Sequence, residues 1–168
     1  MAVIAKCIDR VSALSGKVAA WLCLVLMGEL VYDTVARYGF NAPTEWSYDV
    51  SYMLCGTLFM IGASWTLLQG EHVRIGILYD RASPRVQAAL TIAGYLVFFF
   101  PSMAALFWYG ADFALASWRM QEHAGVSMWS PPIYPFKTII PIAALLLLLQ
   151  GSVLFARTTA RLVKGEPS

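Results

Sequence analysis

Four long runs of apolar residues follow one another along the chain, separated by short polar segments. A transmembrane α-helix needs ~20 mostly apolar residues to cross ~30 Å of hydrocarbon. Residues 86–111 and 138–156 carry no charged side chain at all, and residues 46–69 contain a single acid, Asp49. The first run, residues 17–37, is the weakest because it includes Glu29 and Asp33.

These runs predict an all-α integral membrane protein with four transmembrane helices in a single membrane domain, residues 1–168. We expect the helices at about residues 12–38, 45–69, 84–117 and 134–161. Pro84 suits the first position of the third helix, since its missing N–H would be unpaired there in any case. Pro101 lies well inside the same helix, where we expect a kink.

Composition excludes a soluble fold and a nucleic-acid-binding protein. Hydrophobic residues make up 59% of the chain and charged residues 13%, with a mean hydropathy of +0.63. Soluble domains carry about 25% charged residues, so a soluble chain of this size would lack the polar surface to cover its apolar area. The net charge of +2 is too small to indicate a nucleic-acid partner, and the partner we expect instead is the lipid bilayer.

The distribution of lysine and arginine predicts the orientation in the membrane. Cytoplasmic loops carry an excess of these residues. One side of the predicted topology holds nine of them: Lys6, Arg10, Lys17, Arg74, Arg81, Arg85, Arg157, Arg161 and Lys164. The other side holds three: Arg37, Arg119 and Lys137. We therefore expect both ends of the chain in the cytoplasm.

Ionisable residues inside the predicted helices are the candidates for function, because such groups are costly in hydrocarbon and usually face protein or water. Glu29, Asp33 and Arg37 are spaced four apart and line one face of the first helix. Asp33 and Arg37 can pair with each other, whereas Glu29 needs a partner from elsewhere. Asp49 and Asp112 lie near the outer ends of the second and third helices. These five residues form either a polar seam against another subunit or helix, or a cation or proton site.

No residue pattern indicates an enzyme, a metal site or a cofactor. His72 and His123 fall on opposite sides of the predicted membrane, which argues against a haem held between two helices. The cysteines have no metal-ligand spacing, and no nucleophile, phosphate-binding or metalloprotease motif occurs. We expect a protein that is not an enzyme and binds no cofactor.

Three stretches carry a resemblance to a known family. The first is Arg37-Tyr38-Gly39-Phe40-Asn41-Ala42-Pro43, followed by Trp46 and Asp49. The second is His72-Val73-Arg74-Ile75. The third comprises Ser117-Trp118, Glu122, Trp129, Pro131, Pro135-Phe136-Lys137 and Leu148-Leu149-Gln150. In their order and spacing the chain resembles the small permease (Q) subunit of TRAP transporters, the tripartite ATP-independent periplasmic transporters. The resemblance covers about residues 10–160 and is nearest the branch associated with 2-oxo acids, mannitol and chloroaromatic acids.

The resemblance implies a multi-pass protein of the bacterial inner membrane that works with two partners. One partner is a large, multi-helix TRAP permease subunit, and the other is a periplasmic solute-binding protein that delivers an organic acid anion. Uptake is driven by a sodium gradient, and the small subunit acts as a membrane scaffold. Two departures from the family pattern are Gly76, where many members have an acid, and Asp49, where many have glutamate.

Two further groups of candidate contact residues follow from the predicted topology and the family motifs. At the periplasmic side we expect contacts through Asn41, Pro43, Trp46, Trp118, Glu122 and Trp129. On the cytoplasmic side, His72 and Arg74 are expected to fix the turn and to meet lipid headgroups.

Two other functions stay open at this point. The chain could be an autonomous cation-coupled transporter that uses Glu29, in which case Glu29→Gln would abolish transport outright. It could also anchor a redox enzyme, which the absence of paired histidines disfavours.

Overall fold

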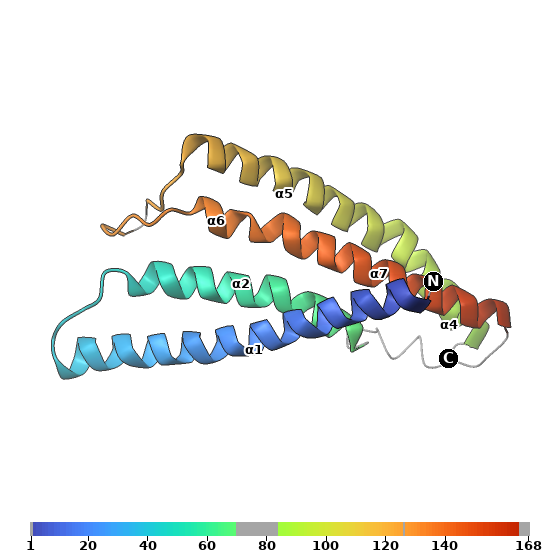
Figure 1. The fold of residues 1–168 in the computed structure, drawn as a ribbon, viewed down its shortest axis with the longest axis horizontal. Coiled ribbons are helices and arrows are strands. Elements are labelled where there is room, and N and C mark those ends of the chain that lie inside the picture. Colours follow the sequence, from blue (N-terminus) through green and yellow to red (C-terminus); the bar gives the residue numbers. More distant parts are fainter. Residues whose placement is uncertain (1, 70–83, 126, 165–168) are drawn as a thin grey trace.

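Each of the four apolar runs forms a helix in the computed structural model, which describes residues 2–69, 84–125 and 127–164 (Figure 1). The elements in chain order are α1 (Ala2–Gly39), α2 (Ser47–Leu68), α4 (Pro84–Gly94), η1 (Tyr95–Phe99), α5 (Phe100–Met120), α6 (Tyr134–Lys137) and α7 (Ile139–Lys164). The spans long and apolar enough to cross a membrane are Ile4–Gly39, Ser47–Leu68, Leu90–Met120 and Tyr134–Ala160. The predicted fold class, an all-α membrane protein with four spans, is confirmed.

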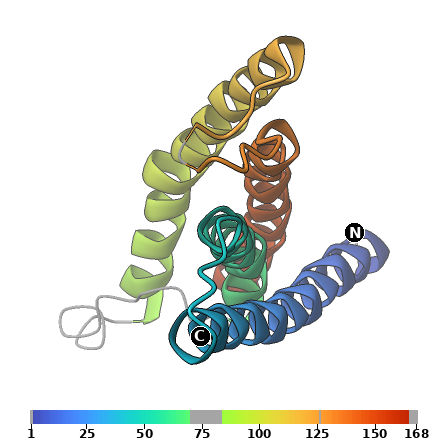
Figure 2. The same cartoon turned by 90° about the vertical axis from the view of Figure 1, so that its left-hand side faces the viewer.

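The helices form an open row and not a closed bundle. The row runs α1, α2, α7, α5, because α2 packs on both α1 and α7 while α5 packs on α7. Figure 2 looks along the helices and shows α1 and α5 at the two edges, with α2 and α7 between them. The two edge helices therefore each turn one broad face away from the rest of the chain.

The buried residues are few and small, and most large apolar side chains point outward. The buried apolar set comprises Leu67, Ala114, Ala124, Ala143, Ala144, Leu147 and Val153. On the edge helices Trp21 is 71% exposed and Trp108 is 68% exposed. Such surfaces are stable only against lipid or another membrane protein.

The first helix begins at Ala2, ten residues before the predicted start near residue 12. Hydropathy locates the stretch that lies in hydrocarbon, whereas the helix continues as long as no residue breaks it, and neither glycine nor proline occurs before Gly16. With 38 residues, α1 is ~57 Å long. Its first part extends past α2 and lies against α7 (Figure 1).

The predicted kink region contains a π-helical turn. In η1 the Phe100 N–H donates to the Tyr95 carbonyl, one residue farther back than in an α-helix. Pro101 follows directly and has no N–H to offer the preceding turn. The wide turn presents Phe99 to α7 at Gly151, where an added Cβ would lie 2.2 Å from the ring. Glycine is therefore required at position 151 for α7 to approach this close.

Candidate functional site

Glu29 is held by two hydroxyls from the neighbouring helix. Ser47 and Ser51 of α2 both donate to its carboxylate, the Ser51 Oγ at 2.6 Å from Oε2. Because the two serines are four residues apart, they share one face of α2 and reach the same group. The partner that Glu29 lacks within its own helix is thus supplied by α2.

Asp33 forms the ion pair predicted from its spacing. The Arg37 Nη2 lies 3.1 Å from its Oδ2, and Thr44 donates a hydrogen bond to Oδ1. Thr44 reaches Asp33 because α1 ends in a tight reversal. Asn41 adopts a left-handed conformation at φ 49°, and the Ala42 N–H returns to the Ala36 carbonyl at 3.0 Å. A left-handed residue just after the last helical turn is a common helix ending, and asparagine is one of the residues that adopt the positive φ.

Asp49 lies almost completely buried at the start of α2, with 3% of its surface exposed. Ser127 donates to its Oδ2 across the space between α2 and the segment that follows α5. Asp49 therefore joins two elements that are distant in sequence.

Lys137 and Glu122 form a second ion pair at the same end of the molecule, with 2.5 Å between Nζ and Oε2. The Lys137 ammonium also lies 4.0 Å from the centre of the Phe113 ring, a cation–π arrangement. The hydrogen bond and the positive charge of Lys137 hold the pKa of Glu122 below its ordinary value. Ser117 Oγ is buried and has no hydrogen-bond partner of ordinary geometry in the described residues.

The segment between α5 and α6 has a fixed shape. The Ala124 N–H donates to the Pro131 carbonyl at 2.8 Å, and the Ile133 N–H donates to the Glu122 carbonyl at 3.0 Å. Gln121 and Ser130 take positive φ values of 47° and 45° to make the turns at either end. Backbone hydrogen bonds thus hold this segment as a small antiparallel loop.

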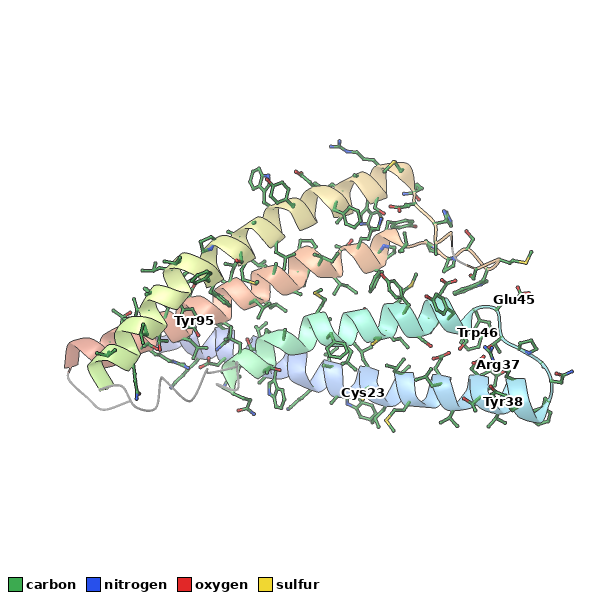
Figure 3. The ribbon with its side chains drawn as sticks, turned by 180° about the vertical axis from the view of Figure 1, so that it is seen from behind. Cys23, Arg37, Tyr38, Glu45, Trp46 and Tyr95 are labelled. Carbon is green, nitrogen blue, oxygen red and sulfur yellow. The ribbon has the colours of Figure 1, made fainter. Side chains whose placement is uncertain are left out.

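Of the tryptophan candidates at this end, Trp118 and Trp46 pack against neighbouring rings, whereas Trp129 is exposed. Trp118 donates its Nε1 hydrogen to Thr138 at 2.8 Å and packs against Tyr134, with the two rings tilted and their centres 4.4 Å apart. Trp46 stacks on Tyr32 at 5.9 Å, beside the α1–α2 reversal shown in Figure 3. Trp129 is 50% exposed.

Asn41 and Pro43 are also exposed, within the connection between α1 and α2. Together with Trp129 they form an accessible rim around this end of the molecule. The contacts predicted for these residues with a second protein stay a prediction.

Asp112 differs from the other candidate carboxylates. It is exposed on α5, and no hydrogen bond or ion pair joins it to any other described residue. Glu29, Asp33 and Asp49 therefore have hydrogen-bond or ion-pair partners within the chain, whereas Asp112 has none among the described residues. Their role as a seam to another subunit stays a prediction.

The remaining candidates, His72 and Arg74, lie outside the described residues, so their predicted part in the cytoplasmic turn is untested. Among the residues that the structure describes, no three His, Cys, Asp or Glu side chains come together in a way that could hold a metal ion.

A polar cluster at the opposite end of the molecule was missed from the sequence. Gln150 of α7 is fully buried, accepts a hydrogen bond from Ser12 at 2.8 Å and donates to Asp9 at 3.2 Å. Arg157 pairs with Asp9 at 2.5 Å, and Ser15 shares a 2.8 Å hydrogen bond with Ser64 of α2.

This inner cluster, defined by Asp9, Ser12, Ser15, Ser64, Gln150 and Arg157, ties α1 to α2 and α7. A signal for it exists in the spacing, since Asp9, Ser12 and Ser15 recur every three residues on one face of α1.

Glycine also allows a close approach at Gly56, whereas Gly62 makes an ordinary van der Waals contact. A Cβ added at Gly56 would lie 2.8 Å from the Phe136 ring, and one added at Gly62 would lie 3.6 Å from Ala19 Cβ. Ala104 and Ala105 are exposed on α5.

The arrangement as a whole resembles a structural frame held by polar contacts at both ends. A family model described as "Tripartite ATP-independent periplasmic transporters, DctQ component" matches residues 26–161. The chain belongs to the DctQ family. No curated protein matches the chain. The DctQ match begins within α1 and ends within α7, so it includes all of α2 and α5 and parts of α1 and α7.

Membership of the DctQ family confirms the predicted resemblance to the small TRAP permease subunit. It identifies the chain as a multi-pass membrane component of a tripartite transporter, and DctQ is a transporter component and not an enzyme family. The assignment to the 2-oxo acid, mannitol and chloroaromatic branch is not supported by the match, which is to the family as a whole.

Proposed function

We propose that this chain is the membrane scaffold of a sodium-driven TRAP transporter in the bacterial inner membrane. In this role it binds a large permease subunit, which carries the substrate and sodium sites and moves the solute. A periplasmic solute-binding protein delivers the substrate, an organic acid anion. Both ends of the chain lie in the cytoplasm, where nine of the twelve lysine and arginine residues gather.

One observation carries the scaffold role: the acids Glu29, Asp33 and Asp49 are occupied by donors within the chain. A carboxylate that binds and releases a transported cation must be open to that cation in part of the cycle. Here two serine hydroxyls hold Glu29, Thr44 and Arg37 hold Asp33, and Ser127 holds buried Asp49. These contacts join helices and loops to one another, which is what a rigid frame requires.

A groove in the described residues also favours a frame over a solute path. It is an open groove of about 800 Å³ between α1 and α2, lined mainly by apolar side chains such as Leu58, Phe59 and Trp65. An organic anion would find one cationic group there, Lys17, and otherwise hydrocarbon. Such a lining suits lipid or protein and not a charged solute.

The open row supports the need for a partner. Its edge helices expose large apolar side chains, and the small-residue positions Ala104 and Ala105 face away from the chain. The accessible rim of Asn41, Pro43 and Trp129 is the surface that we assign to the binding protein, together with the other candidates Trp46, Trp118 and Glu122.

The test is reconstitution in liposomes with an imposed sodium gradient. Liposomes with this chain alone should take up no organic anion, whereas liposomes with both membrane subunits and the binding protein should do so. In the full system Glu29→Gln should keep transport in proportion to the amount of assembled complex. Uptake by this chain alone, abolished by Glu29→Gln, would instead establish the autonomous transporter.

A further inference from the structure

Among the residues that the structure describes, one carboxylate in the membrane spans has no hydrogen-bond or ion-pair partner. Asp112 lies within the span Leu90–Met120. On α5 the buried residues that face α7 are Gly110, Ala114 and Ser117. Asp112 comes two residues after Gly110 and two before Ala114, half a helical turn from each. It therefore points directly away from the rest of the chain.

The depth of Asp112 follows from contacts on either side of it. Gly110 packs against Ile140, and the Phe113 ring meets Lys137. The next residue to Lys137, Phe136, packs against Gly56, which is the tenth residue of the 22-residue α2. On its own helix Asp112 lies eight residues, ~12 Å, before the last residue of α5, Met120, and is therefore deeper than the outer-end position expected from the sequence. An aspartate side chain is too short to reach the headgroups from that depth.

The two edges of the row differ in this respect. The acids of α1, Glu29 and Asp33, are both engaged within the chain, and the outward side chains along its span include Trp21, Leu24 and Val25. That edge matches lipid. The α5 edge instead combines an unpaired carboxylate with large exposed neighbours, Trp108 at 68% and Leu115 at 54% exposure.

We infer that the outer face of α5, centred on Asp112 and flanked by Trp108 and Leu115, is the docking surface for the large permease subunit, and that Asp112 pairs there with a lysine or arginine of that subunit. The inference rests on the proposed function and deepens it. Charge complementarity selects the partner group, because a carboxylate at this depth is stable only when a cation or donor compensates it. Ala105 lies one turn before Trp108 on this face and allows close helix approach.

The first test locates the surface by photo-crosslinking. A photo-reactive phenylalanine derivative replaces either Trp108 or Trp21, two similarly exposed tryptophans on opposite edges of the row, at 68% and 71% exposure. Both membrane subunits are co-expressed, and membranes are irradiated. Position 108 should crosslink to the large subunit, and position 21 should give lipid adducts only. Crosslinking from position 108 no stronger than from position 21, or to a second copy of this chain, would overturn the inference.

The second test asks whether the negative charge of Asp112 is needed for binding of the large subunit. Recovery of the large subunit with the tagged chain should fall by about tenfold or more for Asp112→Ala and farther for Asp112→Lys, since a charge in the partner is left unpaired. Glu45→Gln, which removes an exposed carboxylate outside the spans, should leave recovery unchanged. Equal recovery with all variants would overturn the inference while leaving the proposed function intact. Failure of the wild-type chain to retain any large subunit would instead refute the proposed function, and the docking surface with it.

Discussion

The inner cluster offers a direct test of what holds the row of helices together, through the substitution Gln150→Leu. Gln150 is fully buried and links Ser12 and Asp9 of α1 to α7. Leucine has a similar volume and fits the surrounding run of leucines, so the substitution removes hydrogen bonds with little change in packing.

The expected cost follows from the groups left behind. Ser12 is 1% exposed and donates its hydroxyl to the Gln150 side chain, so in the variant a buried donor loses its acceptor. Leaving such a group unpaired costs ~1–3 kcal/mol, while single hydrogen bonds inside membrane proteins average ~0.6 kcal/mol. Asp9 keeps its 2.5 Å pair with Arg157, so the loss should stay near ~1–3 kcal/mol, of which the unpaired hydroxyl is the larger part.

The assay is thermal unfolding of the purified protein in mild detergent, followed by loss of the monodisperse peak. For a chain of this size, ~1 kcal/mol lowers Tm by ~2–4 °C, so Gln150→Leu should lower Tm by several degrees. The double variant Ser12→Ala with Gln150→Leu removes donor and acceptor together and should recover part of the loss, because matched apolar replacement is close to neutral. A single variant as stable as wild type, or a double variant less stable than the single one, would refute the reasoning.

Three further predictions concern packing, pH and orientation. Gly151→Ala should lower Tm by ~2–12 °C, because the added Cβ would lie 2.2 Å from an aromatic ring and overpacking of this kind costs ~1–3 kcal/mol. The control Gly28→Ala places its Cβ where nothing lies within 4 Å, so it should be neutral or stabilising. Equal effects of the two variants on Tm would contradict this prediction. The pair with Lys137 lowers the folded-state pKa of Glu122 below its ordinary 4.5. The stabilisation that the pair gives the fold is therefore present above pH 4.5 and is lost as the pH falls through the lower folded-state pKa. Between these pH values Tm should drop less in Glu122→Gln than in wild type, and an equal drop of Tm in both proteins would argue against the pair. Cys7 is exposed near the start of α1, so a membrane-impermeant thiol reagent should label it in inside-out vesicles and not in intact spheroplasts, and the reverse result would invert the topology.

Hydropathy was sufficient to predict the number and type of the spanning helices, because a lipid solvent imposes a length and a composition on each span. Spacing within one helix was sufficient for the Asp33–Arg37 pair, which the structure contains. Both predictions depend on local periodicity alone. For the same reason the sequence could name Glu29 as needing a partner.

The partners that come from other helices could not be predicted in the same way. Ser47 and Ser51 reach Glu29 only because α2 docks on α1 in one register. The inner cluster was missed because α1 was expected to start near residue 12, which placed Asp9 in a tail. The open row was also beyond the sequence, since hydropathy reports which segments lie in lipid and not which of them are neighbours.

The most direct test of the central claim, that this DctQ-family chain is the scaffold of a larger transporter, is its co-purification from native membranes in mild detergent. The chain carries a C-terminal tag, and every co-eluting protein is identified by mass. We expect one larger, very hydrophobic subunit in stoichiometric amount. Recovery of this chain alone, as a stable homo-oligomer that transports solute in liposomes, would contradict it.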